Sequence, residues 1–166
     1  MCARDVNDAL KEYRIADTFC ILAITNIDLY PKEEWNFVFG LANMDSNCGV
    51  FSFCRHAEEL EYCEDEAAKQ VAWMKRSCNV MVHEIGHLFG LRHCIYYGCV
   101  LNGSNGLFES SSRKDNILCP ICIAKLKLNA KFDSKERFMH LIEASRALGF
   151  DAHVQKYESL MTAAGV

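Results

Sequence analysis

No stretch of this sequence is apolar enough for a membrane-spanning helix, which needs about 20 consecutive apolar residues. The apolar run at residues 19–24 is short and lies between Asp17 and Asp28. The first residues, Met1 to Asp5, also lack the basic and then apolar layout of a secretory signal peptide. From these absences we expect a cytoplasmic or nuclear protein that has no membrane partner.

An excess of positive charge is missing as well. The chain has 18 lysines and arginines against 22 aspartates and glutamates, which gives a net charge of −4. Surfaces that bind nucleic acid or anionic lipid through charge carry the opposite balance. Aromatic residues are not interleaved with basic runs, as they are on platforms for single strands. We therefore expect no nucleic-acid partner, and the sequence leaves the oligomeric state open.

The segment from His83 to His93 carries the strongest functional pattern. On an α-helix, His83 and His87 lie one turn apart on the same face, so two imidazoles can bind one metal ion. Glu84 points about 100° round the helix and flanks that ion. Gly90 can take a positive φ and end the helix, so that His93 returns as a third ligand. Three histidines leave one position of a tetrahedral zinc open, as catalytic zinc sites do.

The length of this motif decides how much weight it carries. The short form H-E-x-x-H is weak by itself, because it is expected by chance in a large proteome. The form found here, H-E-x-x-H-x-x-G-x-x-H, fixes two more positions and is the metzincin signature. This extension disfavours the alternative that three histidines and a glutamate fell by chance on a half-buried helix.

Ten cysteines raise the question of disulfides, but four of them have the spacing of metal ligands. Cys94 and Cys99 form one close pair, and Cys119 and Cys122 form another. Four thiolates make a closed, structural zinc site. Without an export signal the other cysteines are expected to be reduced thiols, which argues against a disulfide-rich secreted domain. They are scattered without a framework: Cys2, Cys20, Cys48, Cys54, Cys63 and Cys78.

Together these motifs resemble the archaemetzincin family of metzincin zinc metallopeptidases, particularly its animal-type members. The resemblance runs from about residue 16 to about residue 145. It implies a hydrolase that cuts peptide bonds in peptides or proteins, with aminopeptidase-like action on short peptides. The matching segments are His83 to Cys94, Cys99, Asn102 to Asn105, Cys119 to Cys122, Asp28 to Pro31 and Trp35 to Gly40.

The expected chemistry uses two zinc ions, one catalytic and one structural. His83, His87 and His93 would hold the catalytic ion, which lowers the pKa of bound water to about 7. Glu84 would take a proton from that water and deliver it to the leaving amine. The four cysteines would hold the structural ion. By analogy with metzincins, an extended substrate would add as a strand beside Gly49 to Phe53.

Leu101 is a departure inside the resemblance, because the family normally carries methionine, the Met-turn residue, at this position. Leucine has similar volume and apolarity, and such exchanges usually cost less than about 1.5 kcal/mol. The departure leaves an alternative open, namely a catalytically weak or inactive interaction module stabilised by zinc. Glu84 argues against that alternative, since a purely structural site needs no adjacent carboxylate.

The apolar pattern and the resemblance predict one α+β domain over residues 1–166, with a metzincin-like mixed, twisted sheet packed on a long active-site helix. That helix is expected from about Asp65 to Phe89. The other expected elements are a helix at Val6 to Arg14, strands at Thr18 to Thr25, Phe37 to Ala42 and Gly49 to Phe53, a polar loop at Leu101 to Asn116, and a final helix opened by a capping box at Asp133 to Glu136.

The number of strands is smaller than the resemblance implies. The family fold has five, the first two of which would precede Met1, whereas the sequence offers three. We therefore expect either a sheet truncated on its N-terminal side or a smaller sheet. Thr18 to Thr25 is apolar on both faces, so it should be buried between two partners. One partner would be Phe37 to Ala42.

Other polar residues near the motifs are expected to be structural. A phenol of Tyr96 or Tyr97, between the first two cysteines, could stabilise an oxyanion, although packing or shaping of the pocket is the better explanation. Surface, capping or turn roles are expected for His56, His140, His153, Asp28 and Asp45.

Overall fold

The computed structural model describes residues 1–60, 64–104, 109 and 117–165. Its mixed helices and strands confirm the α+β class. Cys63, Asn105 and most of the loop predicted at Leu101 to Asn116 lie outside the described residues. The elements are α1 (Ala3–Leu10), the 3-10 helix η1 (Lys11–Tyr13), β1 (Ile21–Thr25), β2 (Gly40–Asn43), β3 (Cys48–Ser52), the 3-10 helix η2 (Cys54–Leu60), α2 (Glu66–Leu88), α4 (Pro120–Ala130), α5 (Ser134–Ala147) and α6 (Asp151–Ala163).

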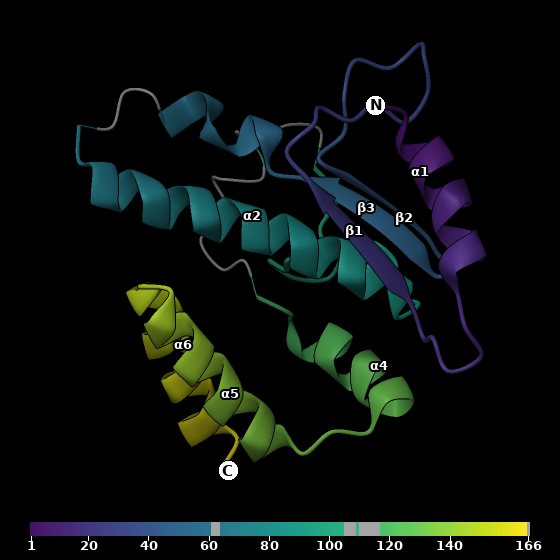
Figure 1. Ribbon diagram of the computed structural model, residues 1–166. Helices are drawn as coiled ribbons and strands as arrows, with labels where there is room; N and C mark the ends of the chain where they lie inside the picture. Colours follow the sequence, from purple (N-terminus) through teal and green to yellow (C-terminus); the bar gives the residue numbers. More distant parts are fainter. Residues whose placement is uncertain (61–63, 105–108, 110–116, 166) are drawn as a thin grey trace.

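The strands form a sheet that lies between α1 on one face and α2 on the other (Figure 1). On the α1 face, Ala3, Leu29 and Val50 make a small buried core. On the α2 face, Gly49 leaves room for two leucines. A Cβ atom at residue 49 would lie 3.1 Å from Leu22 Cδ1 and 3.4 Å from Leu88 Cδ1. This close packing holds the C-terminal end of α2 against the sheet.

The order of strands is β1-β3-β2, which corrects two expectations. β1 pairs in parallel with β3, from Ile21 with Cys48 to Thr25 with Ser52, and does not pair with β2. β2 pairs antiparallel with β3. β3 is therefore the central, fully buried strand, and each of its edges is paired with another strand. The strand that is buried at every position and contacts both α1 and α2 takes the centre. β1 therefore lies at an edge of the described sheet, and its Ile24 is 55% exposed.

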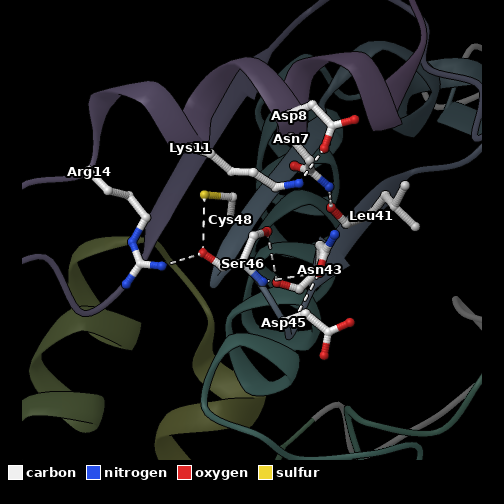
Figure 2. Close-up of polar contacts among 9 residues, drawn as sticks. All are labelled: Asn7, Asp8, Lys11, Arg14, Leu41, Asn43, Asp45, Ser46 and Cys48. Carbon is white, nitrogen blue, oxygen red and sulfur yellow. Dashed lines mark hydrogen bonds and ion pairs between the residues drawn. The ribbon is translucent and has the colours of Figure 1, made fainter.

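The hairpin between β2 and β3 is held by side chains of its own turn, of α1 and of Arg14, which follows η1 (Figure 2). Asn43 Oδ1 accepts hydrogen bonds from the backbone N–H groups of Asp45 and Ser46. Asn7 Nδ2 donates to the carbonyl of Leu41 at 2.9 Å, and Arg14 Nη1 donates to the carbonyl of Ser46 at 2.8 Å. These contacts fix β2, which forms one side of the candidate active site.

The long helix α2 begins and ends close to where the sequence predicts. Asp65 is the N-cap, and its carboxylate accepts from the N–H groups of Ala67 and Ala68. Such caps satisfy N–H groups that have no partner inside the helix. Phe89 is the C-cap. Even this 23-residue helix is not apolar enough to cross a membrane, and neither is any other helix among the described residues.

The C-terminal part has three helices where the sequence predicts one. α5 is the expected helix, and Asp133 Oδ1 accepts from the Glu136 N–H as its cap. α4 starts at Pro120, a residue suited to the first helical turn. α5 and α6 pack as a hairpin (Figure 1), and Gly149 turns the chain between them with a φ of 70°. Neither missed helix has a side-chain hydrogen bond at its N-cap, whereas α5 has one, so no capping signal in the sequence pointed to them.

Candidate metal centres and active site

Two histidines of α2 face each other one turn apart, as the motif predicts. The rings of His83 and His87 have centroids 4.6 Å apart and meet edge to face. Their Nε2 atoms are 3.0 Å apart. Two imidazole nitrogens on a tetrahedral zinc ion are separated by roughly 3.3 Å, given Zn–N bonds of about 2.0–2.1 Å. The pair is therefore spaced as metal ligands.

The end of α2 brings a third histidine to this pair. Gly90 has a φ of 79°, and its N–H donates to the carbonyl of His87. The N–H of Leu91 donates to the carbonyl of Gly86. These two bonds form a Schellman motif, which reverses the chain after a helix. As a result His93 lies 5.2 Å from His83 and 5.0 Å from His87 between ring centroids, and ligand atoms of all three lie within 4.8 Å of one another.

Backbone carbonyl groups orient the two α2 histidines. His83 Nδ1 lies 2.8 Å from the carbonyl oxygen of Val100, and His87 Nδ1 lies 2.7 Å from that of Leu91. A carbonyl only accepts, so each Nδ1 carries the proton and each Nε2 presents a lone pair. Two lone pairs at 3.0 Å repel each other unless they share a cation. The donor set therefore fits zinc.

Glu84 lies on the neighbouring face of α2 and is 7% exposed. Burial raises the pKa of this carboxyl to about 7, against a backbone hydrogen bond with Ala42 that lowers it. Gly40 makes the position possible. A Cβ atom at residue 40 would lie 2.6 Å from Glu84 Cγ. Edge strand β2 therefore holds Glu84 beside the histidine cluster.

The four cysteines with metal-ligand spacing gather into a second cluster. All four are buried, and their sulfur atoms lie within 4.8 Å of one another. Cys94 Sγ and Cys119 Sγ are 3.7 Å apart, and the N–H of Cys119 donates to Cys99 Sγ. The nine described cysteines are all free thiols. Four soft sulfur atoms with no open side fit a closed, structural zinc site; the candidate ligands are Cys94, Cys99, Cys119 and Cys122.

The surroundings of the sulfur atoms favour thiolate at one end of this cluster. Burial raises the pKa of Cys94, but backbone hydrogen bonds from Tyr96 and Tyr97 and the thiols of Cys119 and Cys122 lower it to about 7 overall. Burial and the neighbouring cysteines raise the pKa of Cys122. Cys119 is the N-cap residue of α4.

A cleft of about 710 Å³ opens beside the histidine cluster. One side is the chain from Trp35 to Ala42, which ends in edge strand β2. The other side combines α2 with the segment after it, including Arg92 and Asn102. His83, Glu84, His87 and His93 all line this cleft, so the candidate ligands and the candidate base open onto one space.

Comparison with known proteins identifies the family. Residues 2–128 match the profile of peptidase family M54. The chain belongs to this family, the archaemetzincins. It is 38% identical over 156 residues to Archaemetzincin-2 of Rattus norvegicus, an alignment that covers 81% of this chain and 43% of the relative. The chain therefore spans less than half the length of the curated relatives that it matches first.

Solved archaemetzincin structures share the fold. Archaemetzincin from Methanopyrus kandleri superposes with a TM-score of 0.62 at 31% identity, covering 79% of this chain and 66% of that one. A zinc-dependent peptidase from Methanocorpusculum labreanum superposes with a TM-score of 0.59 at 30% identity, covering 73% and 71%. These findings confirm the family resemblance and the fold class expected from the sequence.

Leu101, the residue at the archaemetzincin Met-turn position, is completely buried. It packs against Gly86, where a Cβ atom would lie 2.6 Å from Leu101 Cδ2. Its carbonyl accepts from the N–H of Cys94, and the preceding residue, Val100, orients His83. Leucine thus fills the space beside Gly86 of α2.

Several other sequence expectations need correction. Tyr96 and Tyr97 are 62% and 58% exposed and do not line the cleft, so neither an oxyanion role nor a pocket-shaping role is supported. His56 was expected at the surface but is fully buried. Asp28 does more than form a turn, because it makes an ion pair with Arg55. The surface role expected for His140 and the turn role expected for Asp45 are confirmed, whereas His153 departs from a surface role. His140 is exposed, Asp45 lies in the β2–β3 turn, and His153 is half-buried beside Phe150.

Sequence reasoning missed the residues that support the site from outside the motif. Gly40 and Ala42 contact Glu84. Asn102 bridges the cysteine loop, since its Oδ1 accepts from the Cys99 N–H and its Nδ2 donates to the Cys94 carbonyl. Gly40 and Asn102 lie in segments that carry the family resemblance. The resemblance indicated that these segments matter, but it did not show which contacts the two residues make.

The contact between Gly40 and Glu84 gives a testable prediction. We expect Gly40→Ala to lower kcat/KM for peptide hydrolysis by at least about tenfold, because small misplacements of reacting groups are costly. Bound zinc should stay unchanged, since no ligand moves. Gly98→Ala is the matched control, because a Cβ atom there meets nothing within 4 Å. Equal rates for the Gly40 variant, the control and the wild type would contradict this role of β2.

Proposed function

We propose that this archaemetzincin chain is a zinc metallopeptidase that hydrolyses peptide bonds. The observation that carries the proposal is the buried Glu84 beside three histidines whose ligand atoms converge. When bound, zinc supplies Lewis-acid chemistry, which polarises a carbonyl group and acidifies water. His83, His87 and His93 would hold it. Glu84 would accept the proton of the attacking water and donate it to the leaving amine.

The backbone of β2 is the proposed support for the substrate. β2 has β3 as its partner on one side in the described sheet, and its residues line the cleft. An extended peptide can hydrogen-bond to such an edge strand and present alternate side chains to pockets. This replaces the expectation that substrate lies along Gly49 to Phe53, because β3 is paired on both edges.

A digest of a peptide library tests the activity. Zinc-loaded protein is expected to cleave peptides, chelation to stop cleavage, and added zinc to restore it. Cleavage that persists after chelation would rule out zinc hydrolysis. A zinc-loaded protein that cleaves no peptide would instead support the alternative, a zinc-stabilised interaction module. Each library peptide is supplied with free and with acetylated N-termini, because aminopeptidase-like action requires the free amine.

We also propose that the chain binds two zinc ions, the second at the cysteine cluster. The support is the chemistry of the two donor sets, three imidazoles with an open side and four buried sulfurs. We further propose the reducing compartment expected from the sequence, cytoplasm or nucleus, where thiols stay available as zinc ligands.

A further inference from the structure

We propose that Phe37 and Phe39 form the specificity-determining wall of the cleft and receive an apolar side chain of the peptide next to the bond that is cleaved. This rests on the proposed function, in that a peptide occupies the cleft. Phe37 and Phe39 are called the aromatic wall below. Four observations support it: its position, its two supports and the chemistry of the rest of the cleft.

The aromatic wall lies next to the candidate base. Phe39 precedes Gly40 directly, and Gly40 approaches Glu84 so closely that no Cβ atom fits between them. Both phenylalanines line the same cleft as the histidines and are half-buried. Their ring centroids are 5.2 Å apart with an interplanar angle of 72°, an edge-to-face pair. A substrate residue beside the reacting carbonyl therefore meets this wall.

An ion pair supports the ring of Phe37. Arg55 Nε donates to Asp28 Oδ1 at 2.7 Å, and Arg55 Nη2 donates to Asp28 Oδ2 at 2.6 Å. This bidentate geometry fixes the guanidinium plane. The Arg55 Cζ atom lies 4.1 Å from the centroid of Phe37, a cation–π contact. Arg55 and Asp28 thus act as positioning residues, because they hold Phe37 without lining the cleft themselves.

A buried histidine supports the ring of Phe39. His56 stacks on Phe39 with centroids 5.3 Å apart and planes inclined by 24°, and it is fully buried. Arg76 Nη1 donates to the His56 carbonyl from α2. Phe39 therefore has a packed layer behind it and cannot retract into the protein. A wall that is already ordered costs little entropy when it binds a side chain, which favours affinity.

The rest of the cleft makes an apolar side chain the best fit to this wall. Among the described residues that line it, Glu84 is the only acidic side chain and Arg92 the only basic one besides the histidines. Arg92 belongs to the opposite side, next to His93. The wall itself offers only aromatic carbon, which pairs well with leucine or phenylalanine and leaves a charged side chain without a partner.

Equilibrium binding tests the wall independently of catalysis. Zinc-loaded Glu84→Gln protein is titrated with blocked, fluorescently labelled peptides that differ at one residue, as leucine, phenylalanine, alanine or glutamate. The position of that residue is scanned along the peptide. We expect one position at which leucine and phenylalanine bind about tenfold or more tightly than alanine and glutamate, in line with discrimination by apolar pockets. Equal binding of all four at every position would overturn the proposal.

Variants then assign the selectivity to the wall. Phe39→Ala should remove the preference for leucine and phenylalanine but leave the alanine peptide unchanged. Phe39→Leu, which keeps apolar volume, should retain part of it. Arg55→Gln should weaken binding of the preferred peptides while zinc content stays constant. Phe132→Ala is the matched control, because this ring also contacts an arginine, Arg137, but lies outside the cleft. Undiminished selectivity in Phe39→Ala would place the subsite elsewhere.

The outcome is separable from that of the proposed function. If the peptides bind selectively but the wild-type protein, which keeps Glu84, does not hydrolyse them, the aromatic wall stands and the peptidase proposal is rejected. Hydrolysis without any apolar preference would keep the peptidase and reject the wall. In the active protein, Arg55→Gln should raise KM for the preferred peptides and leave kcat nearly unchanged, whereas general unfolding would lower the amount of active protein and with it the apparent kcat.

Discussion

Replacing Glu84 with glutamine is expected to lower kcat for peptide hydrolysis by about 10²–10⁴-fold, the usual contribution of a general base. Glutamine keeps the shape of the side chain but cannot accept a proton from water. Both zinc ions should stay bound, because Glu84 belongs to neither donor set. Steady-state kinetics on a peptide from the library digest measure the first effect, and elemental analysis measures the second.

Glu66→Gln is the control for this exchange. Glu66 lies on the same helix, and its side chain is 72% exposed, so the same chemical change there should leave kcat within about twofold of wild type, as for most surface substitutions. Ordinary turnover by Glu84→Gln would remove Glu84 as the base. Loss of zinc from that variant would instead show that the carboxylate supports the metal site, and the loss of rate would then carry no mechanistic meaning.

The candidate metal ligands could be predicted from the sequence because their arrangement is local. His83 and His87 are fixed by helical periodicity, and His93 follows from one turn at Gly90. The two cysteine pairs have short internal spacing. The bounds of α2 were equally accessible, since Asp65 is a capping residue followed by a long apolar stripe. Each inference uses residues that lie within a few turns of one another.

The order of the strands was not accessible in the same way. The sequence shows that Thr18 to Thr25 is apolar, but pairing joins residues far apart in the chain, such as Ile21 with Cys48. From its sequence alone, an apolar edge strand cannot be distinguished from an apolar central strand. The approach of Gly40 to Glu84 joins positions 44 residues apart in the chain, and no local pattern reports it. The supports of the cleft are non-local, whereas its metal ligands are mostly local.

Replacing Cys122 with serine is expected to destabilise the protein strongly and to release one of two zinc ions. Binding of structural zinc contributes about 10–16 kcal/mol in zinc-finger peptides, which is comparable with a total stability of about 5–15 kcal/mol. The cluster joins the loop after α2 to α4, because Cys94 and Cys99 come from the loop and Cys119 and Cys122 from the start of the helix.

The effect should reach the histidine site through that loop. The N–H of Val100 donates to the carbonyl of Ile117, and the Val100 carbonyl orients His83 Nδ1. When the cysteine site is lost, this carbonyl is held less firmly, so remaining zinc should be released at lower chelator concentration than from wild type.

Thermal unfolding followed by circular dichroism, with elemental analysis of reduced, metal-replete protein, measures both effects. Cys54→Ser is the matched control, because Cys54 is an exposed free thiol outside both clusters, and its Tm should stay near that of wild type. A Cys122→Ser protein with two zinc ions and an unchanged Tm would show that this sulfur is not a ligand. A wild-type protein with one zinc ion or fewer would reject the second site altogether. The two results differ in cause, because only the first leaves room for another residue to complete the cluster around Cys94, Cys99 and Cys119.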